Sequence, residues 1–426
     1  MSRLSLIPIL ALLALTGCRK GDAPGAEPAR PAGKLRLVFK YQPLWGDAGP
    51  FRELIASYER AHPDVEVVTE SLPNSSDVLH QFYLTALEGQ ARDFDVFIVD
   101  TIWVPEFARA GWIADLSQAF PPRTIQKDFL PGPAEAVQVD GKTYAVPWYS
   151  DVGLLYYRTD LVPRAPKTYA ELIQFTKDAQ AKQPGLQGYL WQGRQYEGIV
   201  VNGYESIWGH GGKTLSPEGR LLIDTREARA GLATLRSLVT SGVSPTSVTS
   251  GAEEEARRVF QEGRAVFMRN WPYAWAETQR EGSVVQGKVG FAPLPTVSGE
   301  PGHGALGGYQ LALNVHTPAY KKQAAIDLIA HLTSPESSVA LALANGRIPT
   351  RRAVYQDPRL KAGAPFIASL LPVLEAARPR PVTPYYILIS DVLQSEFSAV
   401  VSGVREPAVA LRRAQKLVDH ITEGAE

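Results

Sequence analysis

Residues 94–100 read Phe-Asp-Val-Phe-Ile-Val-Asp (FDVFIVD), a mainly apolar run that is typical of a buried strand and ends on a carboxylate. Two further strand segments and two helical stripes precede it, at residues 35–39, 50–58, 65–68 and 79–87. The order strand–helix–strand–helix–strand predicts a parallel sheet with right-handed crossovers. Because ligands of such sheets bind beyond the carboxyl ends of the strands, Asp100 is a candidate binding residue.

The same alternation continues through the rest of the chain. A strand is predicted at residues 153–157 (GLLYY), and a capping box of Thr168 and Glu171 begins the helix that follows it. Residues 264–268 (RAVFM) predict another strand. Further helical stripes lie at residues 228–239, 253–262, 324–332 and 408–421. Because this is more α/β material than one sheet usually holds, the sequence predicts two α/β lobes.

The overall composition is that of a globular protein without a dominant charge. Lys and Arg total 44, as do Asp and Glu, so no net field would recruit nucleic acid. The seven histidines have no spacing typical of a metal site, and no H-E-x-x-H or G-x-S-x-G motif occurs. We therefore expect no nucleic-acid partner, no metal, no cofactor and no catalytic residues.

The N-terminal segment ends at Cys18, the only cysteine of the chain. Residues 4–15 are nearly all apolar, but the run is too short to span a bilayer as a helix. The end of the run, LTGC (15–18), resembles the lipobox of bacterial lipoproteins, which implies a signal over residues 1–18 and lipidation of Cys18. An ordinary signal peptide is the alternative. Residues 19–34 are rich in Pro, Gly and Ala and predict a flexible tether.

Aromatic residues stand beside carboxylates and arginines in five segments that the pattern assigns to loops. They are Asp100 with Trp103, residues 148–151 (WYSD), residues 271–275 (WPYAW), residues 307–309 (GGY), and residues 378–386 (RPRPVTPYY). Sugars require this mixture, because their C–H faces stack on flat rings while their hydroxyls bond to planar carboxylate or guanidinium groups. The alternative is that each ring belongs to the core, since Trp and Tyr are well buried on average.

Six motifs together make the chain similar to a known family. They are DVFIVD (95–100), VPWYSDVGLLYYRTDL (146–161), WQGRQYEG (191–198), MRNWPYAW (268–275), ALGGYQLALN (305–314) and RPVTPYY (380–386). From about Leu35 to its C-terminus, the chain resembles the carbohydrate-binding lipoproteins of ABC importers, typified by the maltose- and trehalose/maltose-binding proteins. The motifs favour the trehalose/maltose branch.

The resemblance implies an α/β, type II-like periplasmic-binding-protein fold, with a ligand cleft between two lobes and a hinge that the chain crosses more than once. Crossings are expected near residues 146–151 and 293–297. The N-terminal lobe is expected to comprise residues 35–147 plus 296–334, and the C-terminal lobe residues 148–295 plus 335–426. The protein would be an exported monomer, lipid-anchored at the membrane surface on the periplasmic or cell-surface side. It would capture a disaccharide or short oligosaccharide by lobe closure and deliver it to the permease subunits.

The resemblance also implies a set of ligand-binding residues. In this set Asp100, Asp151 and Arg380 form hydrogen bonds with sugar hydroxyls, and Trp271 and Tyr149 stack on or wall the sugar rings. The remaining members are a glycine that lets the backbone approach the ligand and five further side chains: Gly308, Tyr309, Tyr196, Glu197, Tyr273 and Trp45.

Two departures from the family pattern leave the sugar open. Related sequences often carry Trp where this chain has Tyr309. In the first loop, residues 42–49, no acidic residue aligns with the family pattern, although Trp45 and Asp47 are present there. A secreted glycosidase is the main alternative function, since the same side chains can flank a scissile bond. A binding protein for a polyamine or an oligopeptide is the second alternative, and the region of Arg380 argues against a polyamine.

Overall fold

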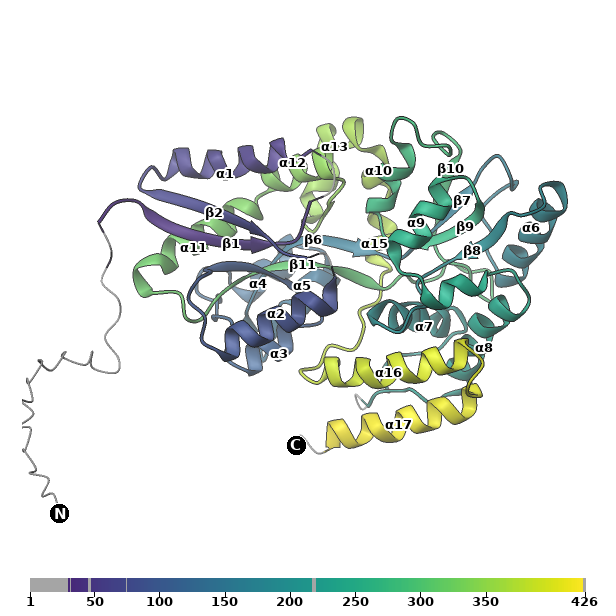
Figure 1. Ribbon diagram of the computed structural model, residues 1–426. Helices are drawn as coiled ribbons and strands as arrows, with labels where there is room; N and C mark the ends of the chain where they lie inside the picture. Colours follow the sequence, from purple (N-terminus) through teal and green to yellow (C-terminus); the bar gives the residue numbers. More distant parts are fainter. Residues whose placement is uncertain (1–29, 31, 45–46, 74, 217–219, 424–426) are drawn as a thin grey trace, which may run out of the picture.

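The computed structural model describes residues 30, 32–44, 47–73, 75–216 and 220–423. They form two α/β lobes, each with its own main sheet, as the sequence predicted (Figure 1). Cys18, the signal segment, the tether as far as residue 29, and Trp45 lie outside the described residues. Within the described ranges, no helix is long and apolar enough to cross a membrane.

The first lobe is built on a six-stranded sheet with the strand order β12-β6-β11-β3-β1-β2. Its strands are β1 (Leu35–Tyr41), β2 (Val65–Ser71), β3 (Val96–Asp100), β6 (Val146–Val152), β11 (Leu306–Leu313) and β12 (Ile348–Pro349). β1 pairs in parallel with β2 and β3, which confirms the sheet predicted around residues 94–100. β11 pairs antiparallel with both β3 and β6 and so occupies the middle of the sheet.

Helices lie above and below this sheet in Figure 1. They are α1 (Gly49–Ala61), α2 (Ser76–Glu88), α3 (Val104–Arg109), α4 (Pro122–Asp128), α5 (Pro131–Ala136), α11 (Ala319–Leu332) and α12 (Pro335–Asn345), with a hairpin of β4 (Gln138–Val139) and β5 (Lys142–Thr143). The ring of Tyr83 in α2 lies 4.8 Å from that of Phe97 in β3, and both are fully buried. The hydroxyl of Tyr58 in α1 donates to the carbonyl of Ala324 in α11 at 2.7 Å, which joins these helices.

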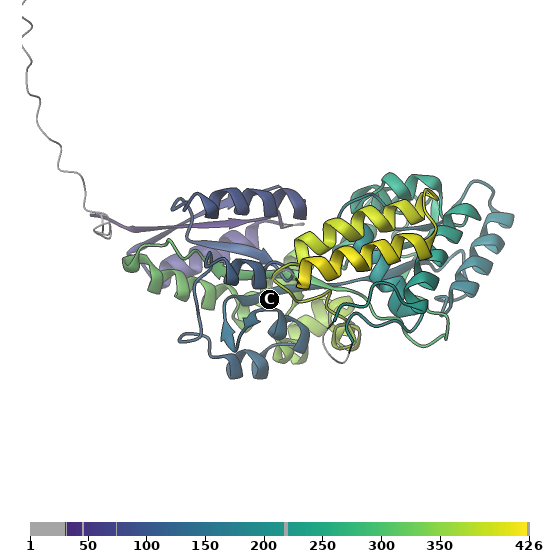
Figure 2. The same cartoon turned by 90° about the horizontal axis from the view of Figure 1, so that it is seen from below.

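The second lobe has a four-stranded sheet with the strand order β10-β7-β9-β8. Its strands are β7 (Leu154–Arg158), β8 (Gln187–Leu190), β9 (Ala265–Asn270) and β10 (Val289–Ala292). Its helices are α6 (Tyr169–Lys182), α7 (Glu197–Gly209), α8 (Arg226–Thr240), α9 (Glu253–Gln261), α10 (Tyr273–Gln279), α16 (Tyr386–Val401) and α17 (Pro407–Glu423). The two C-terminal helices lie side by side in Figure 2, and α7 is buried along its whole length. Three short helices lead to them: α13 (Pro358–Gly363), α14 (Pro365–Ser369) and α15 (Leu371–Glu375).

The predicted start of α6 is partly as expected. Thr168 Oγ1 accepts a hydrogen bond from the backbone N–H of Glu171 at 3.1 Å, which is the N-cap contact. The Glu171 carboxylate accepts from the backbone N–H of Lys167 at 2.7 Å rather than from that of Thr168. One half of the capping box is therefore present, and the other half is shifted by one residue.

The chain passes from the first sheet to the second at Gly153, which separates β6 from β7. A Cβ on this residue would lie 1.9 Å from Oε1 of Glu205, so only glycine fits here. The return passage ends where β11 begins, because Val297 still bonds to Gly209 of the second lobe at 3.0 Å. The single-residue link, the longer return segment and a third passage between β12 and α16 together form the hinge between the lobes.

These positions differ from the expected lobe boundaries. β6 belongs entirely to the first sheet, so the first crossing lies just after residues 146–151, and the return lies after residues 293–297. Residues 335–349 were expected in the C-terminal lobe, but α12 packs on α1 and β12 pairs with β6. The physical reason is that hydrophobic periodicity marks a strand or helix without specifying the sheet that it joins.

Candidate functional site

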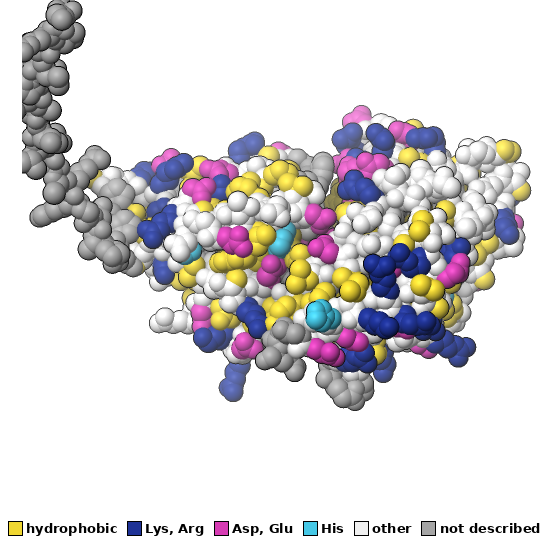
Figure 3. Space-filling view, turned by 60° about the horizontal axis from the view of Figure 1, so that its bottom comes forward, with side chains coloured by type: hydrophobic (Ala, Val, Ile, Leu, Met, Phe, Trp, Pro, Cys, Tyr) yellow, Lys and Arg dark blue, Asp and Glu magenta, His cyan; other side chains and the backbone are white. Residues whose placement is uncertain are grey.

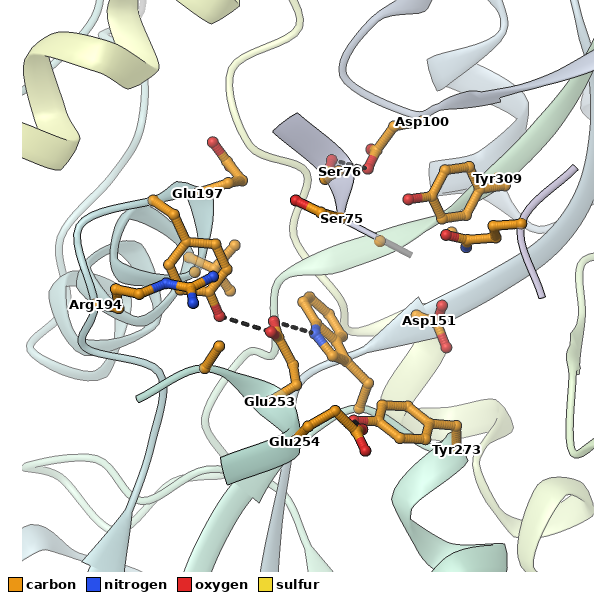
Figure 4. A pocket seen from close by; sticks show the side chains of 18 of the residues that line it. Ser75, Ser76, Asp100, Asp151, Arg194, Glu197, Glu253, Glu254, Tyr273 and Tyr309 are labelled. Carbon is orange, nitrogen blue, oxygen red and sulfur yellow. Dashed lines mark hydrogen bonds between the residues drawn. The ribbon is translucent and has the colours of Figure 1, made fainter. Parts of the chain in front are cut away.

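A cavity of about 320 Å³ lies between the two lobes. Figure 4 shows Ser76, Asp100 and Tyr309 on one side of it and Arg194, Glu253 and Tyr273 on the other. Nine residues that the sequence singled out line this cavity: Asp100, Asp151, Tyr196, Glu197, Trp271, Tyr273, Gly308, Tyr309 and Arg380. Tyr149 does not line it, and Trp45 lies outside the described residues.

Two aromatic rings of the second lobe are held by one carboxylate at the start of α9. Glu253 Oε2 accepts a hydrogen bond from the Tyr196 hydroxyl at 2.7 Å, and Oε1 accepts from Trp271 Nε1 at 3.3 Å (Figure 4). The guanidinium of Arg194 lies 4.6 Å from the centre of the Tyr196 ring. These contacts fix the orientation of both rings, which a ligand with flat C–H faces requires.

A second carboxylate of α9 is bound to Tyr273. Its hydroxyl donates to Glu254 Oε1 at 2.6 Å, while Arg257 donates to Glu254 Oε2 at 2.7 Å. Burial opposes the ionised form of Glu254, but the hydrogen bonds from Arg257 and Tyr273 outweigh it and lower the pKa of this carboxyl. The tyrosine hydroxyl is therefore engaged by an ionised group of the protein.

The two aspartates of the first lobe differ in their surroundings. Asp100, at the carboxyl end of β3, accepts hydrogen bonds from Thr101 Oγ1 at 3.1 Å and Ser76 Oγ at 3.4 Å. Asp151 accepts no hydrogen bond from any described residue. Burial, together with the charge of Asp100, raises the pKa of Asp151 to about 7, although Arg347 opposes the shift. Both carboxyls line the cavity, and Asp151 is the one to which no described side chain donates.

Arg380 links the two lobes at the edge of the cavity. Its Nη1 donates to Glu197 Oε1 at 2.7 Å, and its Nη2 lies 3.5 Å from Asp100 Oδ1. Glu197 also accepts from the hydroxyls of Tyr386 at 2.6 Å and Ser390 at 2.5 Å. Three protein donors therefore bond to the Glu197 carboxylate, and this residue positions Arg380 at the cavity.

Gly308 has a packing role besides its place in the cavity lining, and Tyr149 has a role that differs from the expected one. Gly308 has φ = +113°, and a Cβ there would lie 2.3 Å from the carbonyl oxygen of Tyr149, so glycine is needed for the approach of β11 to β6. Tyr149 was expected to wall the sugar, but it is 1% exposed and lies behind the cavity surface. Its hydroxyl accepts from Gln42 Nε2 at 2.8 Å, and the guanidinium of Arg347 lies 4.4 Å from the centre of its ring.

Twelve lining residues were missing from the expected set, and eight of them have polar side chains: Gln42, Ser75, Ser76, Arg194, Glu253, Glu254, Glu255 and Arg347. Ser75 and Ser76 look like an ordinary helix start, and they do begin α2. Glu253 and Glu254 lie in the first turn of α9, where acidic residues are common because they interact favourably with the helix dipole. Neither helix start lies in one of the motifs that the sequence analysis singled out, so no signal in the sequence pointed to these residues.

The lining combines flat rings with carboxylates and guanidinium groups, which is the combination that binds polyhydroxylated ligands. Across the described ranges, no group of three or more His, Cys, Asp or Glu side chains is placed so that it could hold a metal ion.

Comparisons with known proteins agree with this geometry. A family model described as bacterial extracellular solute-binding protein matches residues 43–338. The chain is 34% identical over 354 residues to a probable ABC transporter-binding protein of Deinococcus radiodurans, with 80% of this chain and 83% of that protein covered. It is 26% identical over 334 residues to a maltotriose-binding protein of Pyrococcus abyssi, with 78% and 69% covered. The maltose-bound structure of T. maritima MalE3 matches with a TM-score of 0.83 at 37% identity, over 91% of this chain and 99% of that one.

Proposed function

We infer that this chain, which belongs to the family of bacterial extracellular solute-binding proteins, captures a disaccharide or short oligosaccharide and passes it to an ABC importer. One observation carries the inference. A cavity of about 320 Å³ between the lobes is lined by the rings of Trp271 and Tyr196 from one lobe and by Asp100 and Asp151 from the other. Rings suit the C–H faces of a sugar, and the carboxyls suit its hydroxyls.

The ligand class is supported by the relatives. One of them is named a maltotriose-binding protein, and the T. maritima structure, which shares 37% identity, holds maltose. The cavity volume lies at the lower end of the roughly 300–1,000 Å³ range of small-molecule sites, which suits a disaccharide better than a long glucan. We therefore propose a trehalose- or maltose-like ligand.

Capture would proceed by closure of the lobes without breaking any bond. A ligand that contacts both lobes stabilises the closed arrangement, whereas one that contacts a single lobe does not. The hinge at Gly153 and the inter-lobe contact of Arg380 with Glu197 and Asp100 support this mechanism. The permease subunits of the importer would recognise the closed form.

The chain would work as an exported, lipid-anchored monomer. Cys18 in the LTGC sequence would carry the acyl chains, and residues 19–34 would tether the lobes near the membrane surface. On the face drawn in Figure 3, Lys and Arg side chains lie among Asp and Glu side chains on both lobes, which suits a freely moving body better than a nucleic-acid surface. Mass spectrometry of the N-terminal peptide from bacterial membranes tests the acylation.

Calorimetric titration with trehalose, maltose, sucrose and maltotriose tests the proposed ligand class. We expect at least one of these sugars to bind, and we expect it to be recovered intact after long incubation. Binding followed by cleavage of the glycosidic bond would favour the glycosidase alternative. Absence of binding to all four sugars would refute the proposed function.

A further inference from the structure

Arg347 lines the cavity although no sequence motif pointed to it. It follows Gly346, which ends α12 with φ = +64°, a left-handed conformation that redirects the chain toward β12. The residue is 6% exposed, so its guanidinium is almost entirely removed from solvent. A charged group in such a place requires fixed partners, and the structure supplies only some of them.

The plane of the Arg347 guanidinium is fixed from two sides. It lies 4.4 Å from the centre of the Tyr149 ring, and Nη2 donates to the carbonyl oxygen of Pro43 at 3.0 Å. Gln42 holds the Tyr149 hydroxyl at 2.8 Å, so the ring beneath the guanidinium cannot turn freely. The arrangement explains why Tyr149 is buried behind the wall: it supports the arginine instead of contacting the ligand.

One donor of Arg347 is left without a partner. Its Nε is buried and forms no hydrogen bond, a condition that is unfavourable unless a bound molecule satisfies it. Asp151 lines the same cavity, and its carboxylate accepts no hydrogen bond from a described residue. The charge of Arg347 acts on Asp151, yet among the described residues the two form no ion pair within 4.0 Å. A fixed donor and a free acceptor of opposite charge therefore line one cavity without closing on each other.

We propose that Arg347 and Asp151 together bind a vicinal diol of the sugar, with one hydroxyl accepting from the guanidinium and its neighbour donating to the carboxylate. The proposal rests on the proposed function and narrows it to pyranosides that present two adjacent free hydroxyls at this wall. A charged donor beside a charged acceptor suits two neighbouring hydroxyls, because each hydroxyl can both donate and accept. Arg347 is then a specificity-determining residue, and Tyr149 is a positioning residue for it.

The test is calorimetry on the purified protein with the tightest-binding sugar among trehalose, maltose, sucrose and maltotriose, and with its mono-deoxy analogues. We expect Arg347→Met and Asp151→Asn each to weaken binding by about 10- to 100-fold, since each removes a charged hydrogen-bond partner. The double variant should lose less than the two single losses combined, because the two side chains serve one diol.

Arg351→Met is the matched control. Arg351 also stacks on an aromatic ring, that of Phe129 at 4.2 Å, and its Nε donates to the carbonyl oxygen of Thr333 at 2.6 Å, but it does not line the cavity. Its replacement should leave the affinity unchanged. An unchanged affinity in Arg347→Met, with sugar binding intact in the wild type, would overturn this proposal alone.

The analogues keep the test valid if Arg347→Met folds poorly. With the wild-type protein, a sugar that lacks either one of two adjacent hydroxyls should bind more weakly than the parent sugar. For the hydroxyl that contacts Asp151, this difference in affinity should vanish in Asp151→Asn. If the loss from each deoxy position were the same in Asp151→Asn as in the wild type, the proposal would be wrong. If the wild type bound none of the four sugars, the proposed function would fail first, and this proposal with it.

Discussion

The guanidinium of Arg269 lies 4.0 Å from the centre of the Trp271 ring and is itself held by Glu205. The two charged side chains form a bidentate pair, with Nε–Oε2 at 2.8 Å and Nη2–Oε1 at 2.6 Å. Glu205 Oε1 also accepts from the backbone N–H of Ala305 at 2.9 Å, just before the chain returns to the first lobe in β11. The ring that lines the cavity is therefore connected to the hinge through one buried ion pair.

Glu205→Gln should destabilise the protein strongly. It would leave the Arg269 charge buried without its counter-charge, which lowers the free energy of unfolding by about 3–5 kcal/mol. Urea denaturation measures this change. The control is Glu53→Ala, which breaks the exposed pair of Glu53 with Arg60 and should change the free energy of unfolding by less than about 1 kcal/mol. Equal effects in the two variants would contradict the role given to the buried pair.

Glu253→Ala should weaken sugar binding through the two aromatic rings that this carboxylate holds. It would release the Tyr196 hydroxyl and Trp271 Nε1, so that neither ring stays fixed, and we expect the dissociation constant to rise about 3- to 30-fold. In a Tyr196→Phe background, where one of the two bonds is already absent, the same change should have a smaller effect. Strict additivity in this double-mutant cycle would show that Glu253 does not act through the tyrosine.

Asp151 should make the stability of the ligand-free protein depend on pH. Its pKa is about 7 in the folded protein and 3.8 in its ordinary state, chiefly because burial disfavours the charge, with Asp100 adding to the shift and Arg347 and Arg269 opposing it. The folded state therefore holds the proton more tightly, and this group's contribution to stability is lost as the pH rises from about 4 to 7. Asp151→Asn should raise Tm by about 1–3 °C more at pH 8 than at pH 5. A shift of the same size at both pH values would contradict this.

Gly308→Ala tests the close approach of β11 to β6. A Cβ would meet the Tyr149 carbonyl oxygen at 2.3 Å in a backbone conformation of φ = +113°. We expect the free energy of unfolding to fall by at least about 2 kcal/mol. Gly346→Ala is the control, because that glycine also has a positive φ, +64°, but nothing lies within 4 Å of the added carbon. The loss in Gly346→Ala should be the smaller one, and the reverse order in urea denaturation would be inconsistent with the packing described.

The first-lobe sheet could be predicted from local signals. The strand at residues 94–100 is almost wholly apolar, and the apolar stripes of the helices before it have the helical period, so the parallel β1–β2–β3 arrangement followed. The position of β11 in the middle of that sheet could not be predicted in this way, because its partners are separated from it by many residues. Hydrophobic periodicity predicts where a strand lies, but it does not specify which distant strand pairs with it.

The candidate site was predictable to a similar degree. Asp100 ends a buried strand and Trp271 follows one, and the motifs that contain them indicated their place at the cavity. Arg347 gave no such signal, because a single arginine after a helix-ending glycine looks like a surface residue. For Tyr149 the sequence suggested a ligand contact, because this tyrosine lies within one of the site motifs. In the structure its side chain is buried behind the cavity surface, where it packs against Arg347.

Capture of a sugar between the two lobes is tested most directly by calorimetric titration of Asp100→Ala and Trp271→Ala beside the wild type. Asp100 belongs to the first lobe and Trp271 to the second, and both line the same cavity. If the sugar contacts both lobes, each variant should weaken the binding of the best disaccharide by at least about tenfold while its thermal unfolding stays cooperative. Wild-type affinity in either folded variant would contradict capture between the lobes.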